Sequence, residues 1–290
     1  MFVGQLIIAG IVSGAIYALI AVGLVVIYKA SHVLNFAHGH VSAVAAFVAF
    51  SLLVDKEMAI PIAIFIAVAV SIFVSLLVER TVIAPLAEER PLTLVVATLA
   101  VAMIISGCLI LIWGPSPKEF PPLIEGRLFT VSGITVSKAQ GLMVVTMLLV
   151  VGMLSAFFKF TSMGIAMRAA SENRTIASLL GVNLRVVSVV SWGIGGALGA
   201  IAAVLVAPQL SLTPDQLTAV VVQGFLAVVL AGFTNIGAAV VGGFITGVSL
   251  NLFSGLVVSD MPSIFLLGLI LVVLLVRPHG LFGKSETVRL

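Results

Sequence analysis

The sequence predicts an all-α, polytopic membrane protein, and three observations carry that prediction. Apolar residues make up 61% of the 290 positions. Charged residues make up only 9%, whereas a soluble domain carries about 25%. The apolar residues form continuous runs of about 20 positions, which is the length of a membrane-spanning helix. A transmembrane β-strand would instead alternate apolar and polar residues over about ten positions.

Eight or nine membrane segments, transmembrane or re-entrant, follow from these runs. We place them at 5–28, 38–54, 59–79, 92–113, 140–158, 186–207, 217–233, 236–257 and 261–276. Segment 38–54 is short, and only two residues separate the seventh and eighth segments, so each of these could be a re-entrant or broken helix. We expect a single transmembrane domain over residues 1–290. The first basic residue, Lys29, follows the first apolar run, so we expect no cleavable signal peptide.

Basic residues set the expected orientation of the segments. The longest polar interval between them, Lys159–Arg185, holds four of the 14 basic residues. If that interval is cytoplasmic and all nine segments cross, ten basic residues lie inside and four outside, in agreement with the positive-inside rule. The ten are Lys29, Arg80, Arg90, Lys159, Arg168, Arg174, Arg185, Arg277, Lys284 and Arg289. This orientation puts the N-terminus outside and the C-terminus in the cytoplasm. It also accounts for the net charge of +3 without nucleic-acid binding.

The longest interval on the expected outer side is the loop at 114–139. Its four prolines prevent a helix. Its second half, Phe129–Val136, is expected to form a short hairpin over the membrane surface. The loop could help to form an outer mouth or could be a plain linker, and the sequence leaves both open.

The cytoplasmic interval, about 159–185, has the pattern of a short amphipathic helix. Its apolar face consists of Met163, Met167, Ala170, Ala177 and Leu180. Its polar side consists of Arg168, Glu172 and Arg174. Ser171 is expected to cap a second helical turn, and Gly181 is expected to end it. Such a helix could dock in a groove of a soluble partner or lie on the lipid surface, and the pattern permits both.

A second polar cluster, Asn35–His40, separates the first two apolar segments. Asn and Gly favour a turn there, and polar groups at membrane depth must be satisfied by protein or water. The cluster is therefore either a helix break that lines a translocation path or an ordinary loop. His32, His38 and His40 lack a neighbouring carboxylate or thiolate, so we expect no metal site.

Uncharged polar residues recur in the late segments and could line a wet cavity or bond helix to helix. They are Gln209, Gln223, Thr234, Asn235, Thr246 and Asn251. Acids are scarce within the segments, and Glu79 lies at a segment end. Because a proton- or sodium-coupled carrier usually needs a buried ionisable residue or an ion site at a discontinuous helix, this scarcity argues that the energy for any transport comes from elsewhere.

Neither an energy source nor an enzyme site is visible on the chain. The tripeptide Gly283-Lys284-Ser285 lacks the upstream glycine of a P-loop and follows an apolar helix rather than a strand. No nucleophile and base form a recognisable catalytic set. The single cysteine, Cys108, lies in an apolar run and is expected to pack inside.

Small residues four positions apart mark three helix faces for close packing. They are Gly10-xxx-Gly14-xxx-Ala18, Gly195-xxx-Gly199 and Gly243-xxx-Gly247. These faces could meet within the chain or at an interface between subunits.

Several motifs, in order along nearly the whole chain, resemble the permease subunits of ABC importers for branched-chain amino acids. They are Gly14–Leu19, Asn35–Gly39, Glu79-Arg80, Arg90–Thr93, Ala97–Leu99, Met167–Ala170, Leu179–Val182, Gly242–Phe244 and Arg277–Gly283. The resemblance implies a subunit that forms a translocation path and binds no ATP itself. The implied partners are a second, similar permease, two cytoplasmic ATP-binding subunits that hold ATP and Mg, and an extracytoplasmic substrate-binding protein.

The resemblance also implies roles for individual residues. The interval 159–185 matches the coupling segment that docks on an ATP-binding subunit. The implied coupling residues are Met163, Met167, Arg168, Ala169, Ala170, Ser171, Glu172, Arg174, Leu180 and Gly181. The expected path residues are Asn35, His38, Gln223 and Asn251. ABC importers in general place a glycine about four residues after the paired alanines, and here Arg174 stands near that position.

Alternatives remain at the level of substrate and mechanism. The same type of importer could carry urea, short amides or other amino acids. A stand-alone secondary carrier or channel would transport without ATP, and a receptor or scaffold would not transport at all. A multi-pass protein of a bacterial-type cytoplasmic membrane is expected under each of these readings.

Overall fold

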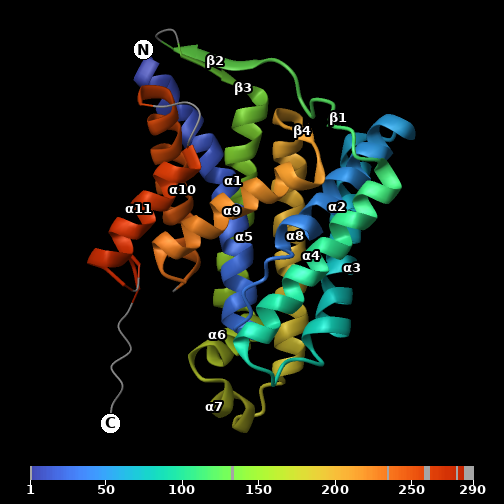
Figure 1. Ribbon diagram of the computed structural model, residues 1–290, viewed down its shortest axis with the longest axis vertical. Coiled ribbons are helices and arrows are strands. Elements are labelled where there is room, and N and C mark those ends of the chain that lie inside the picture. The colour runs from blue at the N-terminus through green and yellow to red at the C-terminus, as the bar shows by residue number, and fades with distance from the viewer. Residues whose placement is uncertain (1, 132–133, 234, 258–261, 279, 284–290) are drawn as a thin grey trace. The chain divides into compact units, whose positions relative to one another are not determined.

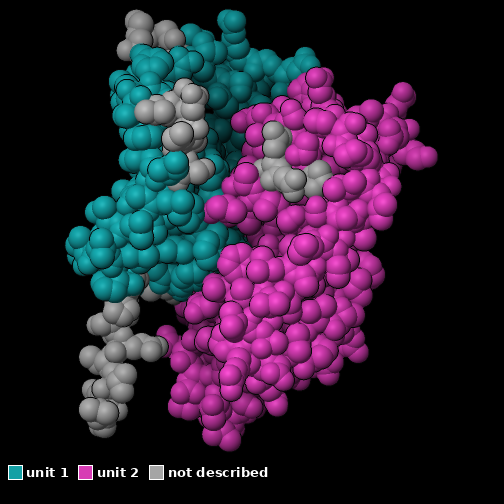
Figure 2. Space-filling model, viewed as in Figure 1, with its two compact units in different colours: residues 1–25, 124–147, 223–290 teal, residues 26–123, 148–222 magenta. Residues whose placement is uncertain are grey.

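The computed structural model describes residues 2–131, 134–233, 235–257, 262–278 and 280–283. These residues form two compact units, each assembled from separate stretches of the chain (Figure 2). Unit 1 combines residues 1–25, 124–147 and 223–290, and unit 2 combines residues 26–123 and 148–222. Three of the four boundaries fall inside helices, and the fourth, between residues 123 and 124, falls in the loop between β1 and β2. The single domain over 1–290 stays a prediction.

Helices dominate both units (Figure 1). Three helices run from one unit into the other: α1 (Phe2–Ser31), α5 (Lys138–Phe160) and α9 (Pro214–Ala231). Unit 1 adds α10 (Ile236–Leu256), α11 (Pro262–Val276) and the strands β2 (Arg127–Val131) and β3 (Ile134–Ser137). Unit 2 adds the helices α2 (His38–Phe50), α3 (Ile60–Val78), α4 (Pro91–Trp113), α6 (Ser162–Glu172), α7 (Arg174–Leu179) and α8 (Leu184–Val206). Its short elements are η1 (Ser51–Asp55), η2 (Glu79–Ile83), η3 (Ala207–Gln209), β1 (Lys118–Glu119) and β4 (Ser211–Leu212).

The nine apolar segments correspond to nine apolar helical stretches. Seven of the stretches in the described chain are long and apolar enough to cross a membrane. Two are shorter, Leu217–Ala231 and Ile264–Val276. The segment expected at 59–79 continues through η2, so its helical stretch reaches Ile83. The all-α fold class is confirmed. Met261, where the last segment was expected to start, lies outside the described residues.

Unit 2 is organised around α8, which packs on α2 and α3. The buried face of α3 carries a small residue at every fourth position, namely Ala63, Ala67, Ser71 and Ser75. The Ser71 hydroxyl lies 3.0 Å from the carbonyl oxygen of Gly196, and the Ser75 hydroxyl donates to that of Trp192 at 2.7 Å. Small side chains bring the two backbones close, and the hydroxyls then bond helix to helix.

Glycines also set the packing of α1 on α10 in unit 1. A Cβ added at Gly10 would lie 2.6 Å from the Cα of Val248, and one at Gly14 would lie 2.9 Å from the Cα of Phe244. In the other direction, a Cβ at Gly243 would meet the backbone of Ala18 at 2.6 Å. Two of the three small-residue faces therefore meet each other within the chain. The third face differs in detail, because α8 makes its close approaches at Gly196 and Gly199.

The outer loop forms two short antiparallel pairs. In unit 1, β2 and β3 form the hairpin expected at Phe129–Val136, with Thr130 opposite Thr135. In unit 2, β1 pairs with β4, which ties the loop to the segment after α8.

The expectation that Cys108 packs inside was wrong, because this residue is exposed on α4.

The C-terminal segment folds back onto α9 within unit 1. The backbone N–H groups of Leu281 and Phe282 donate to the carbonyl oxygens of Leu230 and Ala231 at 2.8 and 3.1 Å. Gly280 has a φ of 79°, and a Cβ there would lie 2.7 Å from Gly232. Because a helix end leaves its last carbonyls without partners in the helix, this segment caps α9. His279, Lys284 and Arg289 lie outside the described residues.

Candidate functional site

The interval 159–185 folds as two short helices, α6 and α7, at the opposite end of unit 2 from β1 and β4 (Figure 1). The Thr161 hydroxyl caps α6 by accepting the Gly164 N–H at 3.0 Å. The Asn173 side chain caps α7 by accepting the Ile176 N–H at 2.9 Å. Gly181 follows α7 with a φ of 88°, a conformation that glycine adopts without steric cost, as expected for a helix stop.

The predicted cap at Ser171 was wrong. Its hydroxyl donates backwards to the carbonyl oxygen of Arg168 at 2.8 Å, within α6. Asn173 takes the capping position because it has an extended backbone, with a φ of −155°, while Ser171 is still helical. Asn side chains are as good as Ser side chains in this role.

The apolar face predicted for this interval turns mostly inward. Met167, Ala170 and Ala177 are buried within the chain. The outward apolar residues of the interval are instead Phe160 and Ile165, which are 75% and 53% exposed, and Ile176, Leu179 and Leu180, which are 55%, 82% and 78% exposed. We call the last three, Ile176, Leu179 and Leu180, the outward patch. Of the other expected coupling residues, Arg168, Glu172 and Gly181 are exposed, whereas Met163, Ala169, Ser171 and Arg174 are half-buried.

Arg174 connects α7 to the end of α1. Its Nη1 donates to the carbonyl oxygen of Ala30 at 3.1 Å. Partial burial and, to a smaller extent, the positive charge of Arg174 hold the pKa of His32 below its ordinary value. His32 has a φ of 57°, so the chain turns sharply at this point. The contact therefore joins α7 to the end of α1, five residues before Asn35.

That cluster forms the turn between α1 and α2. Asn35 and His38 are 5% and 1% exposed, and the His38 N–H donates to the Asn35 carbonyl at 3.3 Å. Asn35 Oδ1 and His38 Nε2 are buried and have no hydrogen-bond partner among the described residues. A Cβ added at Gly199 would lie 3.1 Å from His38 Nε2, so the ring sits against α8.

Thr98 of α4 anchors this turn and was not among the predicted site residues. It is fully buried. Its Oγ1 accepts the N–H of Phe36 at 3.4 Å, and it lies 2.9 Å from the carbonyl oxygen of Val95 in its own helix and 3.3 Å from that of Leu34. The signal that could have found it is the motif Ala97–Leu99, which contains Thr98 and is part of the family resemblance.

The remaining expected path residues lie in unit 1. Gln223 is half-buried in α9. Asn251 of α10 donates to the carbonyl oxygen of Gly247 at 2.9 Å and to the Ser13 hydroxyl at 3.3 Å. Asn251 thus bonds α10 to α1. Asn235 is the N-cap of α10 and accepts the Ala238 N–H at 2.8 Å. Thr234 lies outside the described residues.

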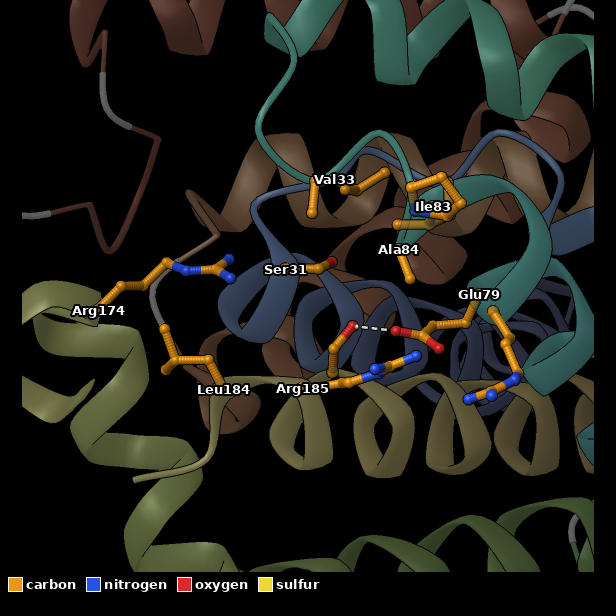
Figure 3. Close-up of a pocket in the computed structure, with 12 residues that line it drawn as sticks. Ser31, Val33, Glu79, Ile83, Ala84, Arg174, Leu184 and Arg185 are labelled. Carbon is orange, nitrogen blue, oxygen red and sulfur yellow. Dashed lines mark hydrogen bonds between the residues drawn. The ribbon is translucent and has the colours of Figure 1, made fainter. Parts of the chain in front are cut away.

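A cavity of about 450 Å³ lies beside η2 and the start of α7 in unit 2. Three arginines line it, namely Arg80, Arg174 and Arg185 (Figure 3). Glu79 also lines it, is only 2% exposed and accepts a hydrogen bond from the Ser188 hydroxyl at 2.8 Å. The expectation that no carboxylate is buried was therefore wrong at Glu79, because the helical stretch continues past it into η2.

No group of three or more His, Cys, Asp or Glu side chains among the described residues is placed to hold a metal ion. His40 instead lies with its Nε2 3.4 Å from the Thr218 hydroxyl.

The sequence-based predictions also missed the buried stripe on α3 that contains Ser71 and Ser75. Its repeat of small residues every four positions is a signal that could have revealed it.

Comparisons with known proteins cover almost the whole chain. A family model for the permease component of branched-chain amino acid transport systems matches residues 6–274. The high-affinity branched-chain amino acid permease BraD of Pseudomonas aeruginosa is 28% identical over 97% of this chain and 96% of its own length. The corresponding LivH of Salmonella typhimurium is 27% identical over 96% of this chain and 94% of its own length.

A third relative is similar over most of the chain. A probable branched-chain amino acid permease LivH of Methanocaldococcus jannaschii is 27% identical over 94% of this chain and 90% of its own length. No solved structure matches the chain. The family consists of transport permeases and not of enzymes. With its seven long apolar helices and this match over residues 6–274, the chain is a multi-pass membrane protein that belongs to the family of branched-chain amino acid transport system permease components.

Proposed function

We propose that this chain forms the translocation path for branched-chain and other hydrophobic amino acids in an ABC importer that is driven by ATP hydrolysis on separate subunits. The observation that carries the proposal is the outward patch on α7 and the residue that follows it. Ile176, Leu179 and Leu180 are exposed on a helix pair whose other face is held inside unit 2. An exposed apolar set of this kind on a short, anchored helix suits docking into a groove of another protein.

The proposed partners follow from the resemblance and the family. They are a second homologous permease subunit, two cytoplasmic ATP-binding subunits, an extracytoplasmic substrate-binding protein and the surrounding lipid. ATP and Mg bind on the ATP-binding subunits, and this chain needs no cofactor. The protein lies in the cytoplasmic membrane with its C-terminus inside. The cavity supports this orientation, because it brings together Arg80, Arg174 and Arg185, three of the basic residues expected on one side.

The coupling residues divide into an inward and an outward group. Met167 and Ala170 are buried, so they anchor α6 rather than touch a partner. Arg168, Glu172 and Gly181 are exposed and are available to a partner. Arg174 faces inward and bonds to Ala30 at 3.1 Å, so a displacement of α7 acts directly on the end of α1. Nucleotide can drive such a change only by binding one conformation more tightly than the other.

The proposed path runs past Asn35, His38, Gln223 and Asn251. Asn35 and His38 support it best, because each has a buried polar atom with no partner among the described residues. Buried polar atoms are nearly always hydrogen-bonded in folded proteins, so a water or a substrate group is the expected partner here. Asn251 bonds α10 to α1 through its amide nitrogen.

Branched-chain amino acids are the proposed substrate because the relatives over the full length carry that name. Urea, short amides and other amino acids are the alternatives within the same importer type. Uptake of radiolabelled leucine, in competition with valine, alanine, urea and acetamide, separates them. Competition by valine, with or without alanine, supports the proposal, and competition by urea or acetamide contradicts the assigned substrate class.

The docking role is tested by replacing Leu179 and Leu180 together with serine. The matched control is Leu111→Ser with Ile112→Ser, an adjacent pair on α4 that is 86% and 68% exposed. We expect the Leu179/Leu180 double variant to lose co-purification with the ATP-binding subunits, while the Leu111/Ile112 variant keeps it. Equal co-purification of both variants would rule out the outward patch as the docking surface.

A further inference from the structure

We propose that the cavity beside η2 binds the phosphate headgroup of an anionic phospholipid, with an acyl chain along the exposed face of α3. The cavity measures about 450 Å³ and is lined by Arg80, Arg174, Arg185 and Glu79 (Figure 3). Three arginines and a single carboxylate line it. The excess of positive charge calls for an anionic ligand.

Two of the three guanidinium groups are uncommitted. Among the described residues, no hydrogen bond or ion pair engages the side chain of Arg80 or Arg185, whereas Arg174 already donates to Ala30. Glu79 accepts a hydrogen bond from the Ser188 hydroxyl. The Arg185 side chain lies on the same side of the cavity as Glu79 (Figure 3). Guanidinium groups bind phosphate oxygens through paired N–H donors, so Arg80 and Arg185 supply the chemistry of a phosphate site.

The surface next to the cavity favours a lipid over a free phosphate ion. Phe73 and Leu77 on α3 are 65% and 49% exposed. Leu77 follows Phe73 by four positions and Arg80 follows Leu77 by three, so the three side chains form one stripe along the helix. An apolar stripe that ends in an arginine at a cavity matches the layout of a phospholipid, with its chain beside Phe73 and Leu77 and its phosphate beside Arg80. Basic pockets at the membrane interface are known to hold such headgroups.

The experiment measures phospholipid binding to the purified full chain by native mass spectrometry. Phosphatidylglycerol is the anionic probe and phosphatidylcholine the zwitterionic one. The test variant carries Arg80→Gln and Arg185→Gln, and the control carries Arg90→Gln, an exposed arginine that does not line the cavity. We expect the wild type and the control to prefer phosphatidylglycerol. The double variant should bind it roughly 30-fold more weakly, from the usual contribution of two basic residues.

A second pair of substitutions separates binding of a phospholipid headgroup from binding of a free phosphate ion. The exchanges Phe73→Ser and Leu77→Ser should weaken phosphatidylglycerol binding and leave the response to inorganic phosphate unchanged. Equal binding of the two phospholipids, or undiminished phosphatidylglycerol binding by the folded double arginine variant, would overturn the proposal. Thermal stabilisation by inorganic phosphate as large as that by phosphatidylglycerol would also overturn it, in favour of a free anion. None of these readouts depends on transport or on the ATP-binding subunits.

Discussion

Thr98 shows how one side chain fixes the turn that carries the proposed path residues. Its hydroxyl reaches both the Leu34 carbonyl and the Phe36 N–H from a buried position on α4. Thr98→Val keeps the shape of the side chain and removes both contacts. Loss of hydrogen bonding at a buried site costs about 1–3 kcal/mol. We expect a lower thermal unfolding midpoint for Thr98→Val in detergent, and near recovery in Thr98→Ser. An unchanged midpoint for the valine variant would show that the turn is held by other contacts.

His32 gives the protein a predicted pH dependence. Partial burial and then the charge of Arg174 lower the pKa of His32 in the folded protein, below the usual value of about 6.5. The unfolded chain then binds more protons than the folded one between the lowered pKa and 6.5, so stability falls as the pH falls through that window. Arg174→Gln removes the second cause and should make the unfolding midpoint less sensitive to acid between pH 7.5 and about 5.5.

The control for this measurement is His32→Asn. Asparagine tolerates the positive φ of 57° at this position and does not titrate. This variant should lose the His32 contribution to the pH dependence altogether. If the wild type and His32→Asn show the same pH profile, the pKa of His32 is not lowered by folding.

Individual residues also show why parts of the site were unpredictable. Arg174 interrupts the alanine–alanine–glycine pattern of ABC importers, and the sequence could not say what it contacts. Its partner, the carbonyl oxygen of Ala30, lies 144 positions away in the chain. A backbone carbonyl carries no sequence signature. The cap at Asn173 was missed for a local reason, since Ser171 and Asn173 are both good caps and backbone conformation alone decides between them.

At the scale of elements, α1 and α10 form a pair whose glycines are matched. A Cβ at Gly247 would lie 2.5 Å from the carbonyl oxygen of Gly10 and from the Cα of Gly14. Gly247→Ala should therefore destabilise the protein by about 1–3 kcal/mol, as overpacking does. Gly107 on α4 is the matched control, because nothing lies within 4 Å of a Cβ added there. Gly107→Ala should be neutral or stabilising, since alanine favours a helix by up to about 1 kcal/mol.

The measurement is unfolding of both glycine variants in mixed micelles, followed by circular dichroism. Equal behaviour of Gly247→Ala and Gly107→Ala would contradict close packing of α1 on α10. The sequence predicted this face correctly as a place of close approach. It left open whether the partner was in the same chain, because the spacing of glycines describes one helix and not its neighbour.

For the pair α6 and α7, the sequence predicted the helices but not which of their apolar side chains face outward. Periodicity predicted the helical character of 159–185 and the stop at Gly181. It did not predict which apolar side chains face outward. Met167, Ala170 and Ala177 are buried within the chain, and Leu179 and Leu180 remain outside. When apolar residues occur on more than one side of a short helix, the pattern alone cannot tell the face toward the protein from the face toward a partner.

At the scale of the whole molecule, hydropathy predicted nearly everything about the number and type of segments. Continuous apolar runs leave no alternative to helices in a bilayer, because every backbone polar group must be satisfied within the segment. The burial of Glu79 was missed because the helical stretch runs through η2 to Ile83, beyond the end of the apolar run. The two-unit arrangement was also missed, since three of its four boundaries lie within α1, α5 and α9 and leave no mark in composition.

The central claim is that this chain is the path of an importer that takes its energy from partner subunits. The direct test is leucine uptake into proteoliposomes that contain both permeases and both ATP-binding subunits, with ATP enclosed and the binding protein outside. Uptake should require ATP and the binding protein. It should be lost in the Leu179→Ser and Leu180→Ser double variant and kept in the Leu111→Ser and Ile112→Ser control. Leucine uptake by this chain alone, in liposomes without ATP, would contradict the claim.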